Sequence, residues 1–138
     1  MKNIVILVAL LSTSLLSFAG APPKAVQKAF KEKFPSAIEV NWTKENATEW
    51  EAEFSMDNTK VSANFKNDGS WVETETAIAT TELPATVTTA IRKQSKGWTI
   101  ITAFKIETAN KGTMYEAEMK AGSKKKEVIY KEDGTPVK

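Results

Sequence analysis

Two pairs of glutamates are the side chains of this sequence with the clearest potential for chemistry. Glu51 and Glu53 form one pair, Glu116 and Glu118 form the other, and a single residue separates the members of each pair. On a β-strand, both members of such a pair point to the same face, about 7 Å apart. Two carboxylates at a comparable separation carry out glycoside hydrolysis if they lie in a cleft and one of them has a raised pKa.

The alternative interpretation places both glutamate pairs on the solvent-exposed face of a sheet. Lysines at positions 60, 66 and 124–126 are then available as cross-strand partners. Nothing in the sequence indicates a cleft around either pair, so we expect these glutamates to face water. An enzyme acting through carboxylates alone would require a buried pair instead.

The composition excludes most other catalytic and cofactor chemistry. The chain has 138 residues and contains no His and no Cys, which excludes Ser-His-Asp triads, thiol nucleophiles and the usual zinc sites. There are 19 Lys and Arg against 17 Asp and Glu, for a net charge of +2, and this balance argues against nucleic-acid binding. We therefore predict no catalytic residue, no cofactor and no metal.

Three acidic segments resemble fragments of calcium-binding loops but fit turns better. They are Asp57-Asn58, Asn67-Asp68-Gly69 and Asp133-Gly134. An EF-hand loop that began at Asn67 would need its closing glutamate at the position of Ile78. Asn, Asp and Gly are typical turn residues, so we expect these segments to connect antiparallel strands.

Hydrophobic periodicity predicts two helices and a series of strands. The first helix begins near Pro23, which suits a first helical turn, and ends at Phe34-Pro35 because a residue before proline avoids helical geometry. The second helix begins at Pro84 and fades toward Gly97. Alternation of apolar and polar residues is typical of strands with one buried face. It predicts strands at 38–43, 49–56, 61–66, 71–78, 99–107, 113–120 and 124–131, with a short tail at 135–137.

The tryptophans divide into expected core residues and one candidate for an interface anchor. Trp42 is in phase with Ile38 and Val40, so we expect all three on a buried strand face. Trp71 alternates with Glu73 and Glu75, and we expect it to share their exposed face. Exposed tryptophans on a charged surface are typical anchors of protein interfaces.

The second half of the chain repeats the pattern of the first. Residues 22–79 align with residues 83–138, with a short insertion in the second half. The clearest matches pair Trp50-Glu51-Ala52-Glu53-Phe54 with Tyr115-Glu116-Ala117-Glu118-Met119, and Phe65-Lys66-Asn67-Asp68-Gly69-Ser70 with Tyr130-Lys131-Glu132-Asp133-Gly134-Thr135. We infer a duplicated unit. The predicted fold is α+β: two tandem helix-plus-antiparallel-meander repeats that form one antiparallel sheet with both helices on one face.

Residues 1–20 are predicted to be a secretory signal peptide. Lys2 supplies a positive start, residues 4–18 are mostly apolar, and Ala19-Gly20-Ala21 offers small residues for cleavage. A membrane anchor is the alternative, but the apolar run is short for a spanning helix and is diluted by serine and threonine. We expect residues 21–138 to form a single exported domain, free of the membrane after cleavage.

The order of the motifs resembles a known family. A proline is followed by V-x-x-A-F, F-P-x-A, V-x-W, an aromatic-centred strand, F-x-x-D-G-x-W, L-P and Y-x-x-D-G. Here these are Pro23, Val26-Gln27-Lys28-Ala29-Phe30, Phe34-Pro35-Ser36-Ala37, Val40-Asn41-Trp42, Phe65-Lys66-Asn67-Asp68-Gly69-Ser70-Trp71, Leu83-Pro84 and Tyr130-Lys131-Glu132-Asp133-Gly134. Over nearly all of residues 21–138, the chain is similar to secreted bacterial proteins described as PepSY-like, or β-lactamase-inhibitor-like.

This resemblance implies a curved antiparallel sheet built from two tandem units, with the helices on its convex side. It also implies a periplasmic or secreted location. Inhibitors of similar fold cover an enzyme's active site with the concave sheet face and a hairpin turn, and they carry disulfides, whereas this chain has no Cys. The PepSY name comes from domains proposed to restrain peptidases.

We therefore expect a non-enzymatic exported protein that binds a protein partner, as an inhibitor or modulator of an envelope enzyme. The expected contact surface comprises the exposed sheet face and a hairpin turn, with Trp71, Glu51, Glu53, Glu73, Glu75, Glu116, Glu118, Asp57 and Asn58. The alternative is a carrier of a small apolar ligand, with a pocket between sheet and helices lined by Trp50, Phe54 and Phe104.

Overall fold

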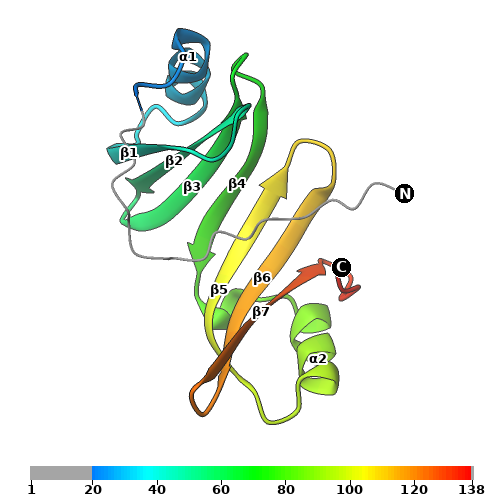
Figure 1. Ribbon diagram of the computed structural model, residues 1–138. Coiled ribbons are helices and arrows are strands. Elements are labelled where there is room, and N and C mark those ends of the chain that lie inside the picture. Colours follow the sequence, from blue (N-terminus) through cyan, green and yellow to red (C-terminus); the bar gives the residue numbers. More distant parts are fainter. Residues whose placement is uncertain (1–19, 138) are drawn as a thin grey trace.

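The protein is built on a single antiparallel sheet with two helices (Figure 1). A computed structural model describes residues 20–137, so the predicted signal peptide lies outside the described residues except for Gly20. The elements in chain order are α1 (Lys24–Lys33), β1 (Ile38–Lys44), β2 (Glu49–Met56), β3 (Thr59–Lys66), β4 (Trp71–Ile78), the 3-10 helix η1 (Thr80–Glu82), α2 (Ala85–Gln94), β5 (Thr99–Thr108), β6 (Gly112–Ala121) and β7 (Lys124–Lys131).

The sheet has seven strands in the order β1 to β7, and each strand is antiparallel to the next in the chain. The predicted α+β class, the strands and the two helices are therefore confirmed. The short tail contributes one isolated bridge between Tyr130 and Pro136. No helix within residues 20–137 is long and apolar enough to cross a membrane.

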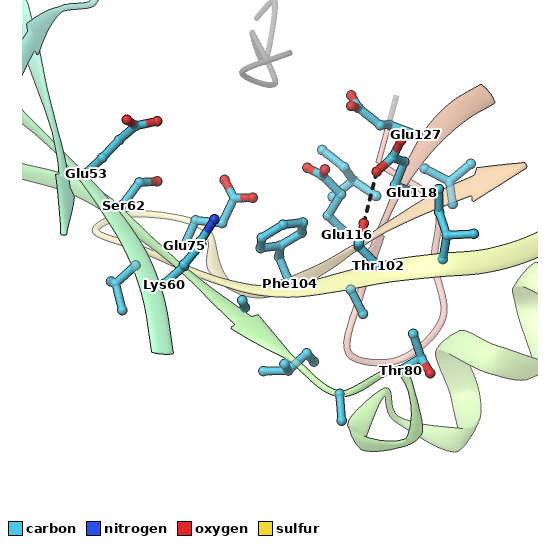
Figure 2. A pocket seen from close by; sticks show the side chains of 18 of the residues that line it. Glu53, Lys60, Ser62, Glu75, Thr80, Thr102, Phe104, Glu116, Glu118 and Glu127 are labelled. Atoms are coloured by element: carbon cyan, nitrogen blue, oxygen red, sulfur yellow. Dashed lines mark hydrogen bonds between the residues drawn. The ribbon is translucent and has the colours of Figure 1, made fainter. Parts of the chain in front are cut away.

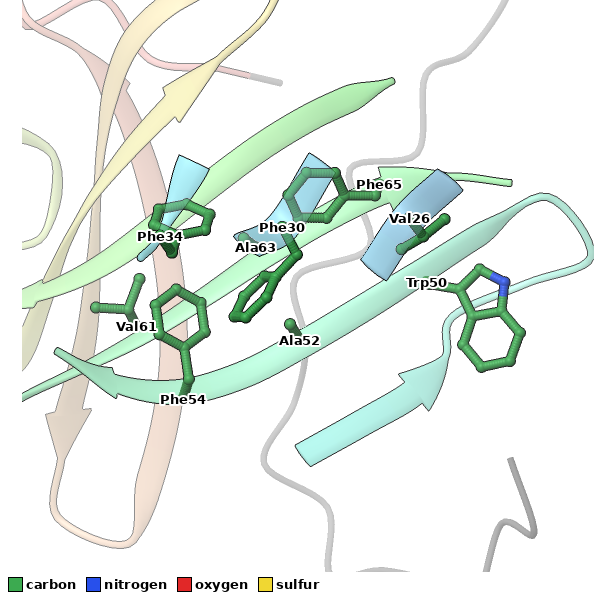
Figure 3. Close-up of a cluster of buried hydrophobic side chains, with 9 residues drawn as sticks. All are labelled: Val26, Phe30, Phe34, Trp50, Ala52, Phe54, Val61, Ala63 and Phe65. Carbon is green, nitrogen blue, oxygen red and sulfur yellow. The ribbon is translucent and has the colours of Figure 1, made fainter. Parts of the chain in front are cut away.

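The first half of the sheet packs against α1 through an aromatic cluster (Figure 3). Helical spacing places Val26 and Phe30 on the buried side of α1, and Phe34 follows at its end. Alternation along β2 and β3 supplies the opposing residues Trp50, Ala52, Phe54, Val61, Ala63 and Phe65. The ring of Phe30 lies 5.0 Å from that of Phe54 and 5.1 Å from that of Trp42, both edge-on.

The second half packs against α2 in a separate cluster. Val87 and Ile91 are the buried residues of α2. They belong to a cluster with Leu83, Ala103, Tyr115, Ala117, Met119 and Tyr130. Ile78 of β4 lies opposite Ala103 of β5, so the pairing of β4 with β5 joins the two halves into one sheet.

Two hairpin glycines lie against the first turns of the helices. Gly69 has φ +89°, and a Cβ built there would lie 2.8 Å from the carbonyl oxygen of Ala25 in α1. Gly134 has φ +83°, and its Cβ would lie 2.7 Å from the carbonyl oxygen of Thr86 in α2. Each turn therefore requires glycine for its backbone angle and for the close approach of the helix.

The first strand departs from the expected burial. Ile38 is 60% exposed and Val40 is 38% exposed, so the expectation that they share a buried face with Trp42 is wrong. The pairing of β1 with β2 shifts between Ile38 and Asn41, and Glu39 has φ +55°. This irregularity breaks the alternation and turns both apolar side chains toward solvent.

Candidate functional site

A groove of about 1770 Å³ lies on the sheet, and most of the predicted glutamates line it (Figure 2). The lining glutamates of β2 and β6 alternate along their strands with residues of the α1 and α2 clusters, and Phe54, Val61, Ala103 and Tyr130 belong both to those clusters and to the lining. The polar lining includes Glu51, Glu53, Lys60, Glu75, Thr102, Glu116, Glu118, Lys125, Lys126 and Glu127, and the apolar lining includes Ala77, Phe104 and Ile129.

Glu116 is buried in this groove, which corrects the expectation that both glutamates of its pair face water. Its cross-strand neighbours are Phe104 on β5 and Ile129 on β7, and only 3% of the residue is exposed. Its Oε2 has no hydrogen-bond partner within the described part of the chain. Burial, followed by the charges of Glu75, Glu127, Glu118 and Glu73, raises the pKa of Glu116 to about 8.

Glu75 of β4 has a similar environment. It lies opposite Ile106 of β5 and Ser62 of β3, and Ile106 is itself buried. Burial raises the pKa of Glu75 to about 7, with further contributions from Glu73, Glu51 and Glu127. The Glu75 and Glu116 carboxylates stand on either side of the Phe104 ring (Figure 2).

Glu118, in contrast, has one of the predicted lysines as a partner, together with Thr102, which was not predicted. Lys125 Nζ lies 2.8 Å from one of its carboxylate oxygens, and the Thr102 hydroxyl donates to the other at 3.1 Å. The hydrogen bond from Lys125 is the main cause that lowers the pKa of Glu118. Glu127 lies directly across from Glu118, and burial, with the charge of Glu118, raises its pKa.

The first glutamate pair has polar neighbours but no lysine opposite it. Glu51 lies between Asn64 and Thr43, and Glu53 lies between Ser62 and Asn41. Lys60 and Lys66 instead lie opposite Ser55 and Glu49, so the predicted pairing with Glu51 and Glu53 is wrong. Burial, then Glu45 and Glu53, raises the pKa of Glu51, although the Thr43 hydroxyl donates to it at 3.4 Å.

Trp71 does not lie on the face of Glu73 and Glu75, so that expectation is wrong. The pairing of β3 with β4 shifts by one residue, so that Phe65 lies opposite Trp71 while Asn64 lies opposite Glu73. This bulge moves Trp71 to the side of the α1 cluster. Its Nε1 donates to the Thr74 hydroxyl at 2.9 Å, and Lys33 Nζ lies 3.9 Å from its ring centre.

The remaining predicted contact residues lie outside the groove. Asp57 and Asn58 form the exposed two-residue turn between β2 and β3, with φ values of +50° and +61°, as expected for a type I′ hairpin. Glu73 is half-buried on β4, and burial raises its pKa. The groove therefore brings together Glu51, Glu53, Glu75, Glu116 and Glu118, but not Trp71, Glu73, Asp57 or Asn58.

Two of the three residues predicted to line a ligand-carrier pocket, Phe54 and Phe104, line the groove, and Trp50 does not. Trp50 is buried in the α1 cluster, Phe54 belongs to that cluster and also lines the groove, and Phe104 lies in the groove beside Glu116. Phe104, Ala77 and Ile129 join the glutamates in the groove, and this association is not among the sequence-based predictions. The available signal was the alternation of Phe104 with Ala103 and Lys105, which places it on the opposite face from Ala103.

The groove is suited to binding cations and exchanging protons. Within residues 20–137, no group of three or more His, Cys, Asp or Glu side chains is arranged to hold a metal ion. A carboxylate buried among apolar neighbours is ionised at a high cost unless a positive charge approaches it. The arrangement of Glu75 and Glu116 therefore favours either protonation or an incoming cation.

Comparisons with known proteins identify relatives of the same fold. A family model described as "Putative beta-lactamase-inhibitor-like, PepSY-like" matches residues 48–137. A "putative periplasmic" protein from Bacteroides eggerthii has a crystal structure with a TM-score of 0.77 and 20% identity, over 86% of this chain and 88% of that one. A protein described as BLIP-like, from Bacteroides fragilis, has a TM-score of 0.72 and 24% identity, over 86% of this chain and 84% of that one.

A third structure, of a DUF2874 family protein from Bacteroides ovatus, has a TM-score of 0.75 and 24% identity, over 86% of both chains. At these identities the similarity establishes the fold alone. No curated protein sequence matches the chain.

Proposed function

This chain belongs to the beta-lactamase-inhibitor-like, PepSY-like family, and on that premise we propose that it is an exported, non-enzymatic protein that binds and modulates an enzyme of the cell envelope. The proposed contact surface is the groove, with Glu51, Glu53, Glu75, Glu116 and Glu118. The observation that carries the proposal is a large hollow lined by both apolar and charged side chains on the sheet, which is a surface suited to a partner.

We also propose that the chain consists of two tandem units, each a helix followed by an antiparallel meander. This proposal is supported by the equivalent positions of Gly69 and Gly134, each against the first turn of a helix. It is also supported by the strand register, in which Ile78 of β4 and Ala103 of β5 are opposite each other and both contact the α2 cluster. Two such units with their helices on one face leave the other face free for a partner.

Export to the periplasm is the second part of the proposal. The sequence of residues 1–20 supports it, and so does the description of the Bacteroides eggerthii structure as a "putative periplasmic" protein. In an oxidising compartment, a chain without Cys depends on its hydrophobic clusters for stability.

A crosslinking pull-down with residues 21–138 from the envelope fraction of the source cell tests this function. The wild-type chain is compared with Ala77→Trp, which places a large side chain in the groove opposite Phe104, and with Ala109→Trp, which adds the same side chain on an exposed turn outside it. We expect one dominant protein that is captured by the wild type and by Ala109→Trp but lost with Ala77→Trp. Equal capture by all three chains, or no specific capture, contradicts the proposal.

A further inference from the structure

We propose that the groove recognises an arginine side chain of its partner, seated over the Phe104 ring between Glu75 and Glu116. This inference rests on the proposed function, because it names the chemical group by which the groove would hold a protein partner. It also makes a separate claim, that the bound cation displaces protons from these two glutamates.

Strands β4, β5 and β6 place the residues of this proposed arginine site, called the seat below, beside one another. Phe104 of β5 lies directly opposite Glu116 of β6 and directly opposite Ala77 of β4. Glu75 is two residues before Ala77 on β4, so it points to the same face as a diagonal neighbour of Phe104. Figure 2 shows the ring between the two carboxylates, on the open side of the sheet. The small Ala77 side chain leaves space beside the ring.

The buried carboxylate of Glu116 is the observation that points to a ligand. Its Oε2 is enclosed and has no donor among the described residues, in a residue that is only 3% exposed. A buried polar atom without a partner costs free energy in the unbound protein. A donor brought by a partner would remove this cost, which makes the site selective for a group with N–H donors.

The lysines of the groove do not donate to the carboxylates of Glu75 or Glu116 in the part of the chain that the structure describes. Lys125 is paired with Glu118. Lys126 donates to the Ser95 hydroxyl at 2.8 Å, with its Nζ 4.5 Å from the Trp98 ring centre. Lys60 of β3 lies opposite Ser55 of β2, and its side chain points toward Glu75 (Figure 2), but the structure describes no ion pair between them within residues 20–137.

Arginine fits this seat better than lysine or a metal ion. A guanidinium group offers several donors in a planar fork, and it stacks on an aromatic ring. It can thus contact two carboxylates across the Phe104 ring at once. A lysine ammonium is a point charge that would use the ring less. A metal ion would need a group of three ligands, and none is present within residues 20–137.

Binding of this cation must release protons. The pKa values of Glu75 and Glu116 are raised to about 7 and about 8, so both groups are partly protonated near neutral pH. The other charged groups facing them are Glu73, Glu51, Glu53, Glu118, Glu127, Lys60 and Lys125. A bound guanidinium favours the ionised carboxylates, so affinity rises with pH up to about 8.

Hexa-arginine is the probe for a first test, with hexa-citrulline as its uncharged counterpart. Calorimetric titrations at about pH 6 and about pH 9 should give affinities that differ by about tenfold or more, with tighter binding at the higher pH. Repeating the titration near pH 7 in two buffers of different ionisation enthalpy should reveal release of about one proton. Binding that does not change with pH, or releases no proton, overturns the inference, since a simple exposed acidic surface behaves in that way.

Two variants locate the site. Glu75→Gln with Glu116→Gln should weaken binding about tenfold or more at about pH 9 and remove the pH dependence. Glu45→Gln with Glu49→Gln also removes two carboxylates, one between β1 and β2 and one at the start of β2, both outside the groove lining, and its affinity should stay within about threefold of the wild type. Equal losses in both variants contradict the proposed seat.

A third variant tests the stacking of arginine on the Phe104 ring while leaving both carboxylates in place. Phe104→Leu keeps both carboxylates, and it should weaken hexa-arginine more than hexa-lysine because only arginine stacks on the ring. Equal weakening of the two peptides overturns the role of Phe104. Circular dichroism and thermal melting establish that each variant is folded before its titration is interpreted.

The same variants separate this inference from the proposed function. A captured envelope protein that is lost with Ala77→Trp and with the Glu75→Gln, Glu116→Gln variant supports both. A captured protein that is lost with Ala77→Trp alone overturns the arginine seat and leaves the proposed function standing. Proton-coupled binding of hexa-arginine without any captured protein supports the seat and contradicts the proposed function.

Discussion

Glu116 and Glu118 stand two residues apart on the same face of β6, and their carboxylates have opposite environments. Glu118 is paired with Lys125 at 2.8 Å and accepts a hydrogen bond from Thr102. Glu116 lies between Phe104 and Ile129, with one oxygen unpartnered in the described chain. The pKa of Glu118 is lowered and that of Glu116 is raised to about 8. Neighbouring strands, rather than the strand that carries them, determine the difference.

Replacing Lys125 by Met should raise the pKa of Glu118 toward its ordinary value, because the hydrogen bond from Lys125 is the main cause of the lowered pKa. Both side chains are partly exposed, so we expect a loss of less than about 1 kcal/mol in the free energy of unfolding. Carboxylate-carbon NMR titration measures the pKa. Lys124→Met, on a residue that lies opposite Ala121, is the control and should leave Glu118 unchanged.

Glu116→Gln should make the protein more stable at alkaline pH. In the unfolded chain a glutamate loses its proton near pH 4.5, whereas folded Glu116 holds it to about pH 8. The folded state therefore binds more protons between these values, and wild-type stability is full below about pH 4.5 and falls as pH rises to about 8. Gln resembles the protonated side chain, so the variant should gain about 1–3 kcal/mol over the wild type at about pH 9.

Urea unfolding at about pH 5 and about pH 9 measures this effect. Glu132→Gln, in an exposed turn, is the matched control and should follow the pH dependence of the wild type. If Glu116→Gln lost stability with rising pH as steeply as the wild type, the buried carboxyl would not be the group responsible.

The similarity of the two glutamate pairs shows how far the sequence could predict the site. Alternation correctly assigned Glu51, Glu53, Glu116 and Glu118 to strand positions that alternate with core residues. Alternation identifies a face, but it does not identify the residues opposite. The register pairs Glu53 with Ser62 and Glu116 with Phe104, and only the second arrangement excludes water. Register depends on contacts between distant segments, which a single sequence does not display.

Strand irregularities explain the incorrect predictions for Trp71 and Ile38. A strict period of two predicted that Trp71 shares a face with Glu73, and that Ile38 is buried with Trp42. One extra residue in β4 and the irregularity of β1 reverse these assignments. The turns, in contrast, were predictable, because Asp57-Asn58 and the Gly69 and Gly134 turns depend on local backbone preferences.

Phe30→Ala should destabilise the protein strongly, because Phe30 is buried at the centre of the α1 cluster. Its ring contacts those of Phe34, Trp42, Phe54 and Phe65. Removing it leaves a cavity that costs about 3–5 kcal/mol. Ile38→Ala, on a residue that is 60% exposed, should cost less than about 1 kcal/mol. Urea unfolding followed by tryptophan fluorescence compares the two, and similar losses would contradict the arrangement of this cluster.

Gly69→Ala should be more costly than Gly112→Ala, although both glycines have positive φ. The values are +89° and +73°, so either substitution strains the backbone by about 1–2 kcal/mol. At Gly69 the new Cβ would also lie 2.8 Å from the Ala25 carbonyl oxygen, whereas nothing lies within 4 Å at Gly112. The hairpin or α1 must then shift, which adds about 1–3 kcal/mol. Thermal and urea unfolding measure the difference. Equal losses would mean that the turn at Gly69 does not press on the first turn of α1, and that backbone angle alone requires glycine there.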